Sequence, residues 1–364
     1  MNCIVIHYGE IGLKKTNRPF FEKKLVENIR KRGLDARREF GRIVAGYRKG
    51  FSKILKTIPG IAYFAPAEMV EPDMDSIIKK AKELVKKGPF RISARRSNKK
   101  FRYTSMEINR MVGDAINLKV DLTHPKTELF IEIGENHAYL YVKKYKGLGG
   151  LPVGVTGKLI SLVSGGIDSP VASYEMIRRG CEIILLHFYN NTQGLKSKIT
   201  ELAKKLAAYQ GRIKLIIVPF LPVQQKVIMH IPAEIRMIVY RRLMLMIGEK
   251  VLKKEGALGF VTGDNAAQVA SQTLENLRVI WSATRENIYA PLIGYDKQGI
   301  INIAKKIGTY QTSIIPYSDC CSYLVARHPE TRATIKEVRK FEKNLEIRKL
   351  VNDSFKNREE IIIS

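Results

Sequence analysis

Residues 164–169, which read Ser-Gly-Gly-Ile-Asp-Ser, are the part of this sequence best suited to chemistry. They follow an apolar run at residues 159–163 and precede Pro170. Two adjacent glycines let the backbone turn tightly and approach a ligand, while Ser169 and Pro170 suit the N-cap and the first position of a helix. The sequence therefore predicts a strand, a tight turn and a helix whose free N–H groups face a bound phosphate.

This turn differs from the two common nucleotide-binding loops. It lacks the Gly-Lys-Ser or Gly-Lys-Thr step of a P-loop and the third glycine of the dinucleotide fingerprint. It resembles instead the PP-loop of ATP pyrophosphatases, which use ATP to adenylate a substrate oxygen and release pyrophosphate. Asp168 suits such a loop if its carboxylate holds Mg²⁺ or orients the departing pyrophosphate. The alternative is a glycine-rich turn that binds no ligand.

A basic segment at residues 86–102 is the second candidate for function. It reads KKGPFRISARRSNKKFR, with eight basic residues, no acidic one and interleaved aromatic residues. Lysine and arginine neutralise phosphates, and aromatic rings stack on unpaired bases. We expect contacts with nucleic-acid phosphates from Arg95, Arg96, Lys99, Lys100 and Arg102. The alternative is a solvated basic loop, and in either case Phe90 and Phe101 belong to the core.

The overall charge also points to a polyanion. Lysine and arginine total 63 against 35 acidic residues, which gives a net charge of +28. Nucleic acid is the usual partner of such an excess. A lysine-rich surface of the kind found in thermophiles is the alternative, but it normally carries matching glutamates. No apolar run reaches the roughly 18 residues of a membrane span, and the first residues lack a secretory signal, so we expect a cytosolic protein.

The cysteines and histidines do not form a metal-binding or disulfide pattern. Four cysteines are too few for a disulfide scaffold. Cys3 and Cys181 lie in apolar, strand-like contexts and are expected to be small core residues, whereas Cys320 and Cys321 are adjacent. The six histidines show no ligand spacing, so we expect no metal site built by these residues.

Periodicity divides the chain into several blocks. Residues 1–50 predict a small α+β unit, with a helix at 20–32 and a strand at 43–47. Residues 51–146 predict a second one, in which Thr104 and Glu107 form a capping box. The glycine-rich stretch 147–157 predicts a linker. Strands and helices alternate over 158–330, which indicates a doubly wound parallel sheet, and 331–364 predicts a charged helical tail.

Four segments resemble the tRNA 4-thiouridine synthetase family, ThiI. They are GLGGLPVG at 147–154, SGGIDSP at 164–170, RRGC at 178–181 and VASQTL at 269–274. The family has a similar order of domains: a ferredoxin-like domain, a THUMP domain and a PP-loop domain. The resemblance therefore implies an α/β fold, with a doubly wound parallel-sheet PP-loop ATP pyrophosphatase domain preceded by ferredoxin-like and THUMP α+β domains.

The resemblance also implies an activity and its residues. In the family, ATP adenylates O4 of uridine 8 in tRNA, and sulfur then displaces AMP to leave 4-thiouridine. Asp168 would act with ATP and Mg²⁺. The expected ATP contacts are Leu162, Val163, Ser164, Gly165, Gly166, Ser169, His187, Phe188, Arg241, Gly263 and Gln272. Three alternatives remain open: 2-thiolation of tRNA, sulfur transfer to a carrier protein for thiamine synthesis, and tRNA binding without catalysis.

The family's sulfur chemistry implies a role for Cys321, which matches its sulfur-handling cysteine best. A thiolate there would carry or resolve a persulfide. We expect no rhodanese domain after Ser364, and the sequence contains no Cys-x-x-Cys. The sulfur donor is therefore open between sulfide, a separate persulfide-carrying protein and a persulfide on Cys320 or Cys321. The oligomeric state is open as well and includes a homodimer.

Overall fold

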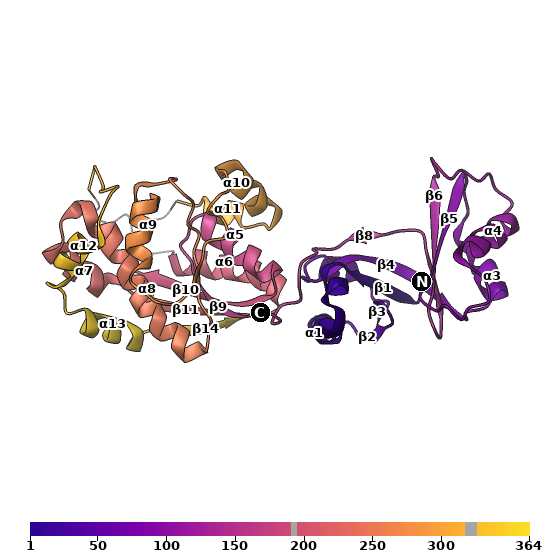
Figure 1. Cartoon of the computed structure of the whole chain (residues 1–364), viewed down its shortest axis with the longest axis horizontal. Helices are drawn as coiled ribbons and strands as arrows, with labels where there is room; N and C mark the ends of the chain where they lie inside the picture. Colours follow the sequence, from indigo (N-terminus) through magenta and orange to yellow (C-terminus); the bar gives the residue numbers. More distant parts are fainter. Residues whose placement is uncertain (191–194, 317–325) are drawn as a thin grey trace. The chain divides into compact units, whose positions relative to one another are not determined.

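The computed structural model describes residues 1–190, 195–316 and 326–364 of the chain (Figure 1). The chain divides into two compact units, Met1–Val155 and Thr156–Ser364. Each unit contains its own sheet; the C-terminal unit has a large hydrophobic core, and the N-terminal unit has a separate core in each half.

In the first half of the N-terminal unit, helix α1 (Arg18–Arg30) packs on one face of the sheet and encloses a hydrophobic core. Alternate residues of its central strand, Ile4 and Ile6, are buried against Leu25 and Ile29 of the long helix and against Phe64. Its elements are β1 Cys3–Tyr8, a 3-10 helix Glu10–Asn17, α1 Arg18–Arg30, β2 Ala36–Glu39, β3 Arg42–Gly46, α2 Phe51–Leu55 and β4 Ile61–Val70. The predicted helix and strand at 20–32 and 43–47 correspond to α1 and β3.

The second half of this unit continues the same sheet. Its elements are α3 Met74–Leu84, β5 Phe90–Arg96, α4 Ser105–Ala115, β6 Thr127–Ile133, β7 Ala138–Tyr141 and β8 Tyr145–Lys146. The predicted capping box of Thr104 and Glu107 is present at the start of α4. The ten-residue strand β4 pairs with β1 and also with β7, so the strand order is β2-β3-β1-β4-β7-β6-β5. Residues 1–155 are thus connected by one sheet.

A buried carboxylate joins the two halves of this sheet. Glu132 on β6 lies 3.1 Å from Arg42 of β3 and 2.9 Å from Nε2 of His7 on β1. It also accepts a hydrogen bond from the hydroxyl of Tyr141 at 2.6 Å. Burial opposes the charge on Glu132, but the His7 and Arg42 contacts outweigh it and lower its pKa to about 2. The carboxylate is therefore ionised and links β1, β3, β6 and β7.

The C-terminal unit is a doubly wound α/β domain, as the alternating pattern predicts. Its sheet has the order β13-β12-β9-β10-β11-β14, and all strands but β14 run parallel. Helices cover both faces of this sheet (Figure 1). The elements are β9 Gly157–Leu162, α5 Asp168–Arg178, β10 Cys181–Tyr189, α6 Leu195–Gln210, β11 Ile213–Pro219, α7 Leu221–His230, α8 Arg236–Glu255, β12 Phe260–Val261, α9 Leu274–Trp281, β13 Ile288–Tyr289, α10 Lys297–Lys306, α11 Tyr310–Ser313, α12 Ile335–Glu342, α13 Ile347–Lys356 and β14 Glu359–Ile363, with short 3-10 turns at Ala233–Ile235 and Ala270–Gln272.

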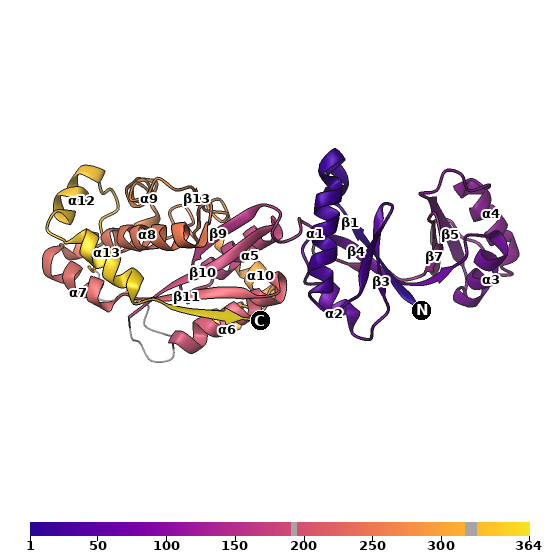
Figure 2. The same cartoon turned by 90° about the horizontal axis from the view of Figure 1, so that it is seen from below.

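The end of the chain differs from the expected helical tail. Helices α12 and α13 are present, but residues 359–363 form β14, which pairs antiparallel with β11 (Figure 2). The sequence there is Glu-Glu-Ile-Ile-Ile, and β-branched isoleucines favour a strand once an open sheet edge is available. The prediction is therefore wrong for these five residues, because the charged residues before them suggested a continued solvated helix.

Candidate active site

The hydroxyl group of Ser169 closes the loop between β9 and α5. The backbone N–H of Ser164 donates to Ser169 Oγ at 3.0 Å, and that hydroxyl donates to the backbone oxygen of Ser164 at 3.2 Å. Ser164 Oγ accepts a hydrogen bond from the N–H of Gly166 at 3.3 Å. The helix begins at Asp168 with Ile167 as its N-cap, so the expectation that Ser169 caps it is wrong. Ser169 lies in the first turn and its side chain reaches back to shape the loop.

The backbone at Gly263 packs directly on this loop. A Cβ atom at Gly263 would lie 2.8 Å from the backbone N of Ser169 and 3.0 Å from the carbonyl carbon of Asp168. Contacts this short with backbone atoms leave no room for a side chain. Glycine at position 263 therefore allows the segment after β12 to approach the start of α5.

A cavity of about 260 Å³ lies at the carboxyl ends of β9 and β10. This is the edge at which open α/β sheets bind ligands. Ten of the residues expected to act at the nucleotide site line it: Leu162, Val163, Ser164, Asp168, Ser169, His187, Phe188, Arg241, Gly263 and Gln272. Gly165 and Gly166 lie in the same loop but not in the cavity lining. The structure thus brings together segments separated by more than 100 positions in the sequence.

One region of the lining is apolar and was missed by the sequence analysis. Met237, Met244 and Leu245 lie on α8 around Arg241, and Ile280 and Trp281 come from the end of α9. The spacing 237, 241, 244 and 245 places these side chains on one face of the helix, so a helical projection from Arg241 could have identified them. Leu186, Thr262, Asp264 and Ser271 complete the lining.

Two aspartates at the cavity are each paired with a cation. Oδ1 of Asp168 lies 2.6 Å from Lys297 Nζ, and its Oδ2 accepts a hydrogen bond from Gln268 Nε2 at 3.1 Å. Oδ1 of Asp264 lies 2.5 Å from Nη2 of Arg241. Lys297 was not predicted, because it begins α10 far along the chain and has no local motif of its own.

His187 is placed by the adjacent strand. Its side chain is buried at the end of β10, and Nδ1 lies 2.8 Å from the backbone oxygen of Val163. Phe188, the next residue, packs edge-on against Phe220 with ring centroids 5.2 Å apart. Backbone contact with Val163 and burial together fix His187 beside the loop.

The basic segment lies on the N-terminal unit. Arg95 and Arg96 are the last residues of β5, and Lys99, Lys100 and Arg102 follow in the loop before α4. All except Arg96 are exposed; Arg96 is half-buried and donates to the backbone oxygen of Phe101 at 3.0 Å. Phe90 is buried and Phe101 packs against the same core, as expected. Four exposed cations therefore lie at the end of β5 and in the loop that follows it.

The cysteines divide into described and undescribed positions. Burial raises the pKa of Cys3 to about 12 and that of Cys181 to about 11, so neither thiol is set up as a nucleophile. Both are core residues, as predicted. Cys320 and Cys321 lie outside the described residues.

The described residues show neither a metal-binding cluster nor a membrane-spanning helix. Across residues 1–190, 195–316 and 326–364, no group of three or more histidine, cysteine, aspartate or glutamate side chains is arranged to hold a metal ion. No helix in the same ranges is long and apolar enough to cross a membrane.

Comparison with known families assigns all three blocks of the chain. The family model described as "Thiamine biosynthesis protein (ThiI)" matches residues 154–347. A ThiI ferredoxin-like domain matches residues 3–65, and a THUMP domain matches residues 71–143. The last two matches follow one another along the single sheet of the N-terminal unit.

Relatives and a solved structure match along almost the full chain. A probable tRNA sulfurtransferase from Moorella thermoacetica is 38% identical, covering 98% of this chain and 96% of the relative. Its counterpart from Thermus thermophilus is also 38% identical, covering 97% and 91%. The crystal structure of a 4-thiouridine synthetase in complex with RNA and ATP is 33% identical and covers 100% of both chains with a TM-score of 0.93. The chain belongs to the ThiI family.

Proposed function

We propose that this chain is an ATP-dependent tRNA sulfurtransferase that converts uridine 8 of tRNA to 4-thiouridine. The observation that carries the proposal is the cavity beside residues 164–169, where a phosphate-binding turn, an Asp168–Lys297 pair and an apolar recess meet. Membership of the ThiI family and its tRNA-sulfurtransferase relatives support the same activity. The cytosol, where tRNA is found, is the compartment we propose for it.

The two kinds of lining suit the two parts of ATP. Adenine fits the apolar recess formed by Leu162, Phe188, Met244 and Trp281, because a planar base is stabilised by burial against such side chains. The triphosphate fits the turn at 164–169, where Gly165 and Gly166 allow close approach and the N-terminus of α5 favours negative charge. In this arrangement the α-phosphorus would lie between the recess and Asp168.

The first chemical step is attack by uridine O4 on the α-phosphorus. The bond from that phosphorus to the bridging oxygen breaks, and pyrophosphate leaves. The ammonium of Lys297 is the nearest described cation to Asp168 and is suited to stabilise the charge that develops on the phosphates. Asp168 in turn orients Lys297 through the 2.6 Å contact.

Mg²⁺ fits this site as an ion carried largely by ATP. The described residues offer no group of three possible protein ligands, whereas Mg²⁺ with nucleotides needs only one or two carboxylates plus phosphate oxygens. Asp168 is the carboxylate at the loop and would be its protein ligand. Bound there, the ion would neutralise charge on the departing pyrophosphate.

The second step replaces oxygen by sulfur. A sulfur nucleophile attacks C4 of the adenylated uridine, and the bond from C4 to the AMP oxygen breaks. With sulfide as donor, this step needs no redox change. With a persulfide-carrying protein as donor, the outer sulfur attacks C4 and AMP leaves, so that uridine and donor are joined by a disulfide. The Cys321 thiolate then attacks the donor's sulfur, which releases 4-thiouridine and leaves a Cys321–donor disulfide that an external thiol reductant must reduce before the next turnover.

The exposed cations of the basic segment are proposed to hold the tRNA backbone. Replacing Lys99 and Lys100 together with glutamine should weaken tRNA binding and reduce its salt dependence, because two phosphate contacts are lost. The exposed Lys250 of α8, replaced in the same way, is the matched control. Equal tRNA affinities for the two variants would show that Lys99 and Lys100 do not contact the tRNA.

The activity is tested directly by incubating the protein with unmodified tRNA, ATP, Mg²⁺ and sulfide. Nucleoside mass spectrometry should detect 4-thiouridine, with AMP and pyrophosphate released in equal amounts. A 2-thiolated base, or tRNA binding with no AMP release, would contradict the proposal. Cys321→Ser should keep activity with sulfide and lose it with a protein persulfide donor.

A second product is favoured by the description of the matching family, which refers to thiamine biosynthesis. The same adenylation and sulfur transfer, applied to the C-terminal carboxylate of a carrier protein, would give a thiocarboxylate. Intact-protein mass spectrometry would detect the oxygen-to-sulfur exchange.

A further inference from the structure

Asp264 is buried in the lining of the cavity and contacts three other lining residues. Oδ1 of Asp264 lies 2.5 Å from Nη2 of Arg241 and 3.4 Å from Nε2 of Gln272. Oδ2 accepts a hydrogen bond from the indole Nε1–H of Trp281 at 3.4 Å. The side chain is 4% exposed, so these donors rather than solvent satisfy its charge. One carboxylate thus connects α8, the segment after β12 and α9.

The partners of Asp264 are positioned to act on a ligand. Arg241 is held at two points, since its Nη1 also donates to the backbone oxygen of Ser271 at 3.2 Å. Gln272 directs its amide N–H toward Asp264, and its Oε1 is buried without a hydrogen-bond partner among the described residues. A buried acceptor without a partner is unfavourable, so Gln272 Oε1 is suited to accept a hydrogen bond from an amino or hydroxyl group of a ligand in the cavity.

We propose that Asp264 is a positioning residue for the nucleotide: its carboxylate fixes the side chains of Arg241, Gln272 and Trp281 in the orientation that binds ATP. The inference rests on the proposed use of this cavity for ATP. The new element is that the carboxylate of Asp264 orients the three side chains that contact ATP, although Asp264 itself need not touch the nucleotide. Side chains that already have the bound orientation lose little conformational freedom when ATP binds. The affinity for ATP is therefore higher without any added contact.

Asp264→Asn tests this directly, because asparagine keeps the size of the side chain but removes its charge. It can no longer accept from all three donors, and its own N–H group would face one of them. We expect the Kd for ATP to rise about tenfold to a hundredfold, the range for hydrogen bonds to a charged group. The rate at saturating ATP should change by less than about threefold, because the effect lies in binding rather than in the transition state.

Trp281 supplies a readout that a merely structural role would not change. It is the only tryptophan in the sequence, so indole fluorescence and the single indole N–H resonance in an NMR spectrum report on this contact alone. In the wild-type protein both should shift on addition of ATP. In Asp264→Asn the resonance should already be displaced without nucleotide.

Glu255→Gln is the matched control. Glu255 is a similarly buried carboxylate of the same domain, with a side chain 9% exposed and paired with Lys214 at 2.9 Å, but it lies outside the cavity. It should lower thermal stability and leave the ATP Kd and the indole signals unchanged. An Asp264→Asn protein that loses stability but binds ATP as the wild type does would overturn the proposal.

Asp264→Glu keeps the charge and covers the case in which Asp264→Asn does not fold. Its extra methylene displaces the carboxylate from its three donors, so a smaller rise in the ATP Kd and a displaced indole resonance are expected. Wild-type values for both would overturn the proposal. ATP binding is measured here without tRNA or sulfide, so wild-type protein that binds ATP but forms no 4-thiouridine would contradict only the proposed function.

Discussion

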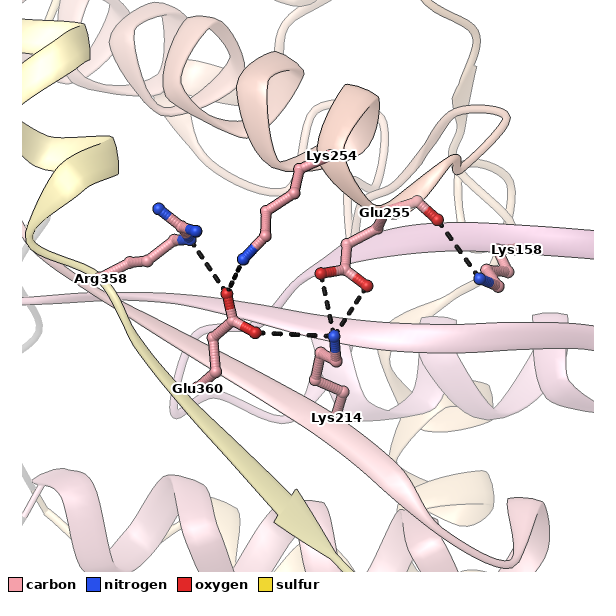
Figure 3. A network of polar contacts seen from close by, with 6 residues as sticks. All are labelled: Lys158, Lys214, Lys254, Glu255, Arg358 and Glu360. Carbon is pink, nitrogen blue, oxygen red and sulfur yellow. Dashed lines mark hydrogen bonds and ion pairs between the residues drawn. The ribbon is translucent and has the colours of Figure 1, made fainter.

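The two ends of the parallel sheet use the same kinds of charged side chain for different purposes. At the amino end, Glu255 and Glu360 are surrounded by cations (Figure 3). Lys214 on β11 lies 2.9 Å from Glu255 and 3.6 Å from Glu360. Lys254 and Arg358 complete the contacts of Glu360. Lys254 lies on α8, Lys214 on β11 and Arg358 directly before β14. The network therefore attaches β14 to the rest of the domain.

At the carboxyl end, Asp168 and Asp264 each face one cation and the cavity. Their partners, Lys297 and Arg241, are held at 2.6 and 2.5 Å. A phosphate that enters the cavity can share the cation of such a pair with the carboxylate, whereas Glu255 and Glu360 do not line this cavity. Position relative to the strand ends, rather than residue type, therefore separates a binding pair from a structural one.

The largest expected effect is on catalysis at the carboxyl end. Asp168→Asn should lower the rate of pyrophosphate release about a thousandfold, because the loop loses the charge that orients Lys297 and Mg²⁺. Stability should change by less than about 1 kcal/mol, since Lys297 is 44% exposed and its ion pair is weakened by solvent. Single-turnover kinetics and thermal unfolding measure the two quantities. A comparable loss of rate in Glu255→Gln would break the distinction between the two ends.

A smaller effect, on ATP affinity and stability, is expected when a side chain is added where Gly263 contacts the loop. In Gly263→Ala the new methyl group would overlap the backbone of Ser169, and overpacking costs typically about 1–3 kcal/mol. We expect weaker ATP binding by at least about tenfold and a lower midpoint of thermal unfolding. Gly113→Ala on α4 is the control, because no atom outside the adjacent helix backbone lies within 4 Å of its added Cβ and alanine favours a helix. Wild-type ATP affinity in Gly263→Ala would show that the loop tolerates displacement.

The sequence predicts the parts of the site that depend on local order. A strand, two glycines and a helix start must lie together, so the loop at 164–169 can be predicted from these residues alone. Leu162 and Val163 are expected at the site only because of the family resemblance. Asp264 and Trp281 are different, because nothing local distinguishes a carboxylate or indole that faces a cavity from one in the core. Lys297 lies 129 residues after Asp168, and only the winding of the sheet brings the two together.

Local sequence is also insufficient to predict where helices and strands begin and end. Ser169 has the residue type of an N-cap, but its hydroxyl bonds to Ser164 across the loop, a contact set by the turn rather than by helix propensity. The strand β14 depends on the open edge of β11, so its isoleucines acquire a partner only in the folded domain. Local rules therefore locate the loop, and tertiary pairing decides its partners.

The smallest expected effect is on the network at the amino end. The hydrogen bond and charge of Lys254, with Lys214 and Arg358, hold the pKa of Glu360 below its usual value of 4.5. A carboxyl with a lowered folded-state pKa stabilises the protein above its unfolded pKa and loses that contribution as the pH falls through the folded value. Glu360→Gln should therefore cost less than about 1 kcal/mol at pH 7 and flatten the loss of stability below about pH 4.5.

Denaturant unfolding at pH 7 and pH 3 measures this difference, with Glu346→Gln as the control. Glu346 is 75% exposed and its contact with Lys349 is 3.8 Å, so its removal should leave the acid slope unchanged. ATP affinity should equal the wild-type value in both variants, because neither residue lines the cavity. A weaker ATP affinity in Glu360→Gln would mean that the anchor of β14 also supports the nucleotide site, and the two ends of the sheet would then be coupled.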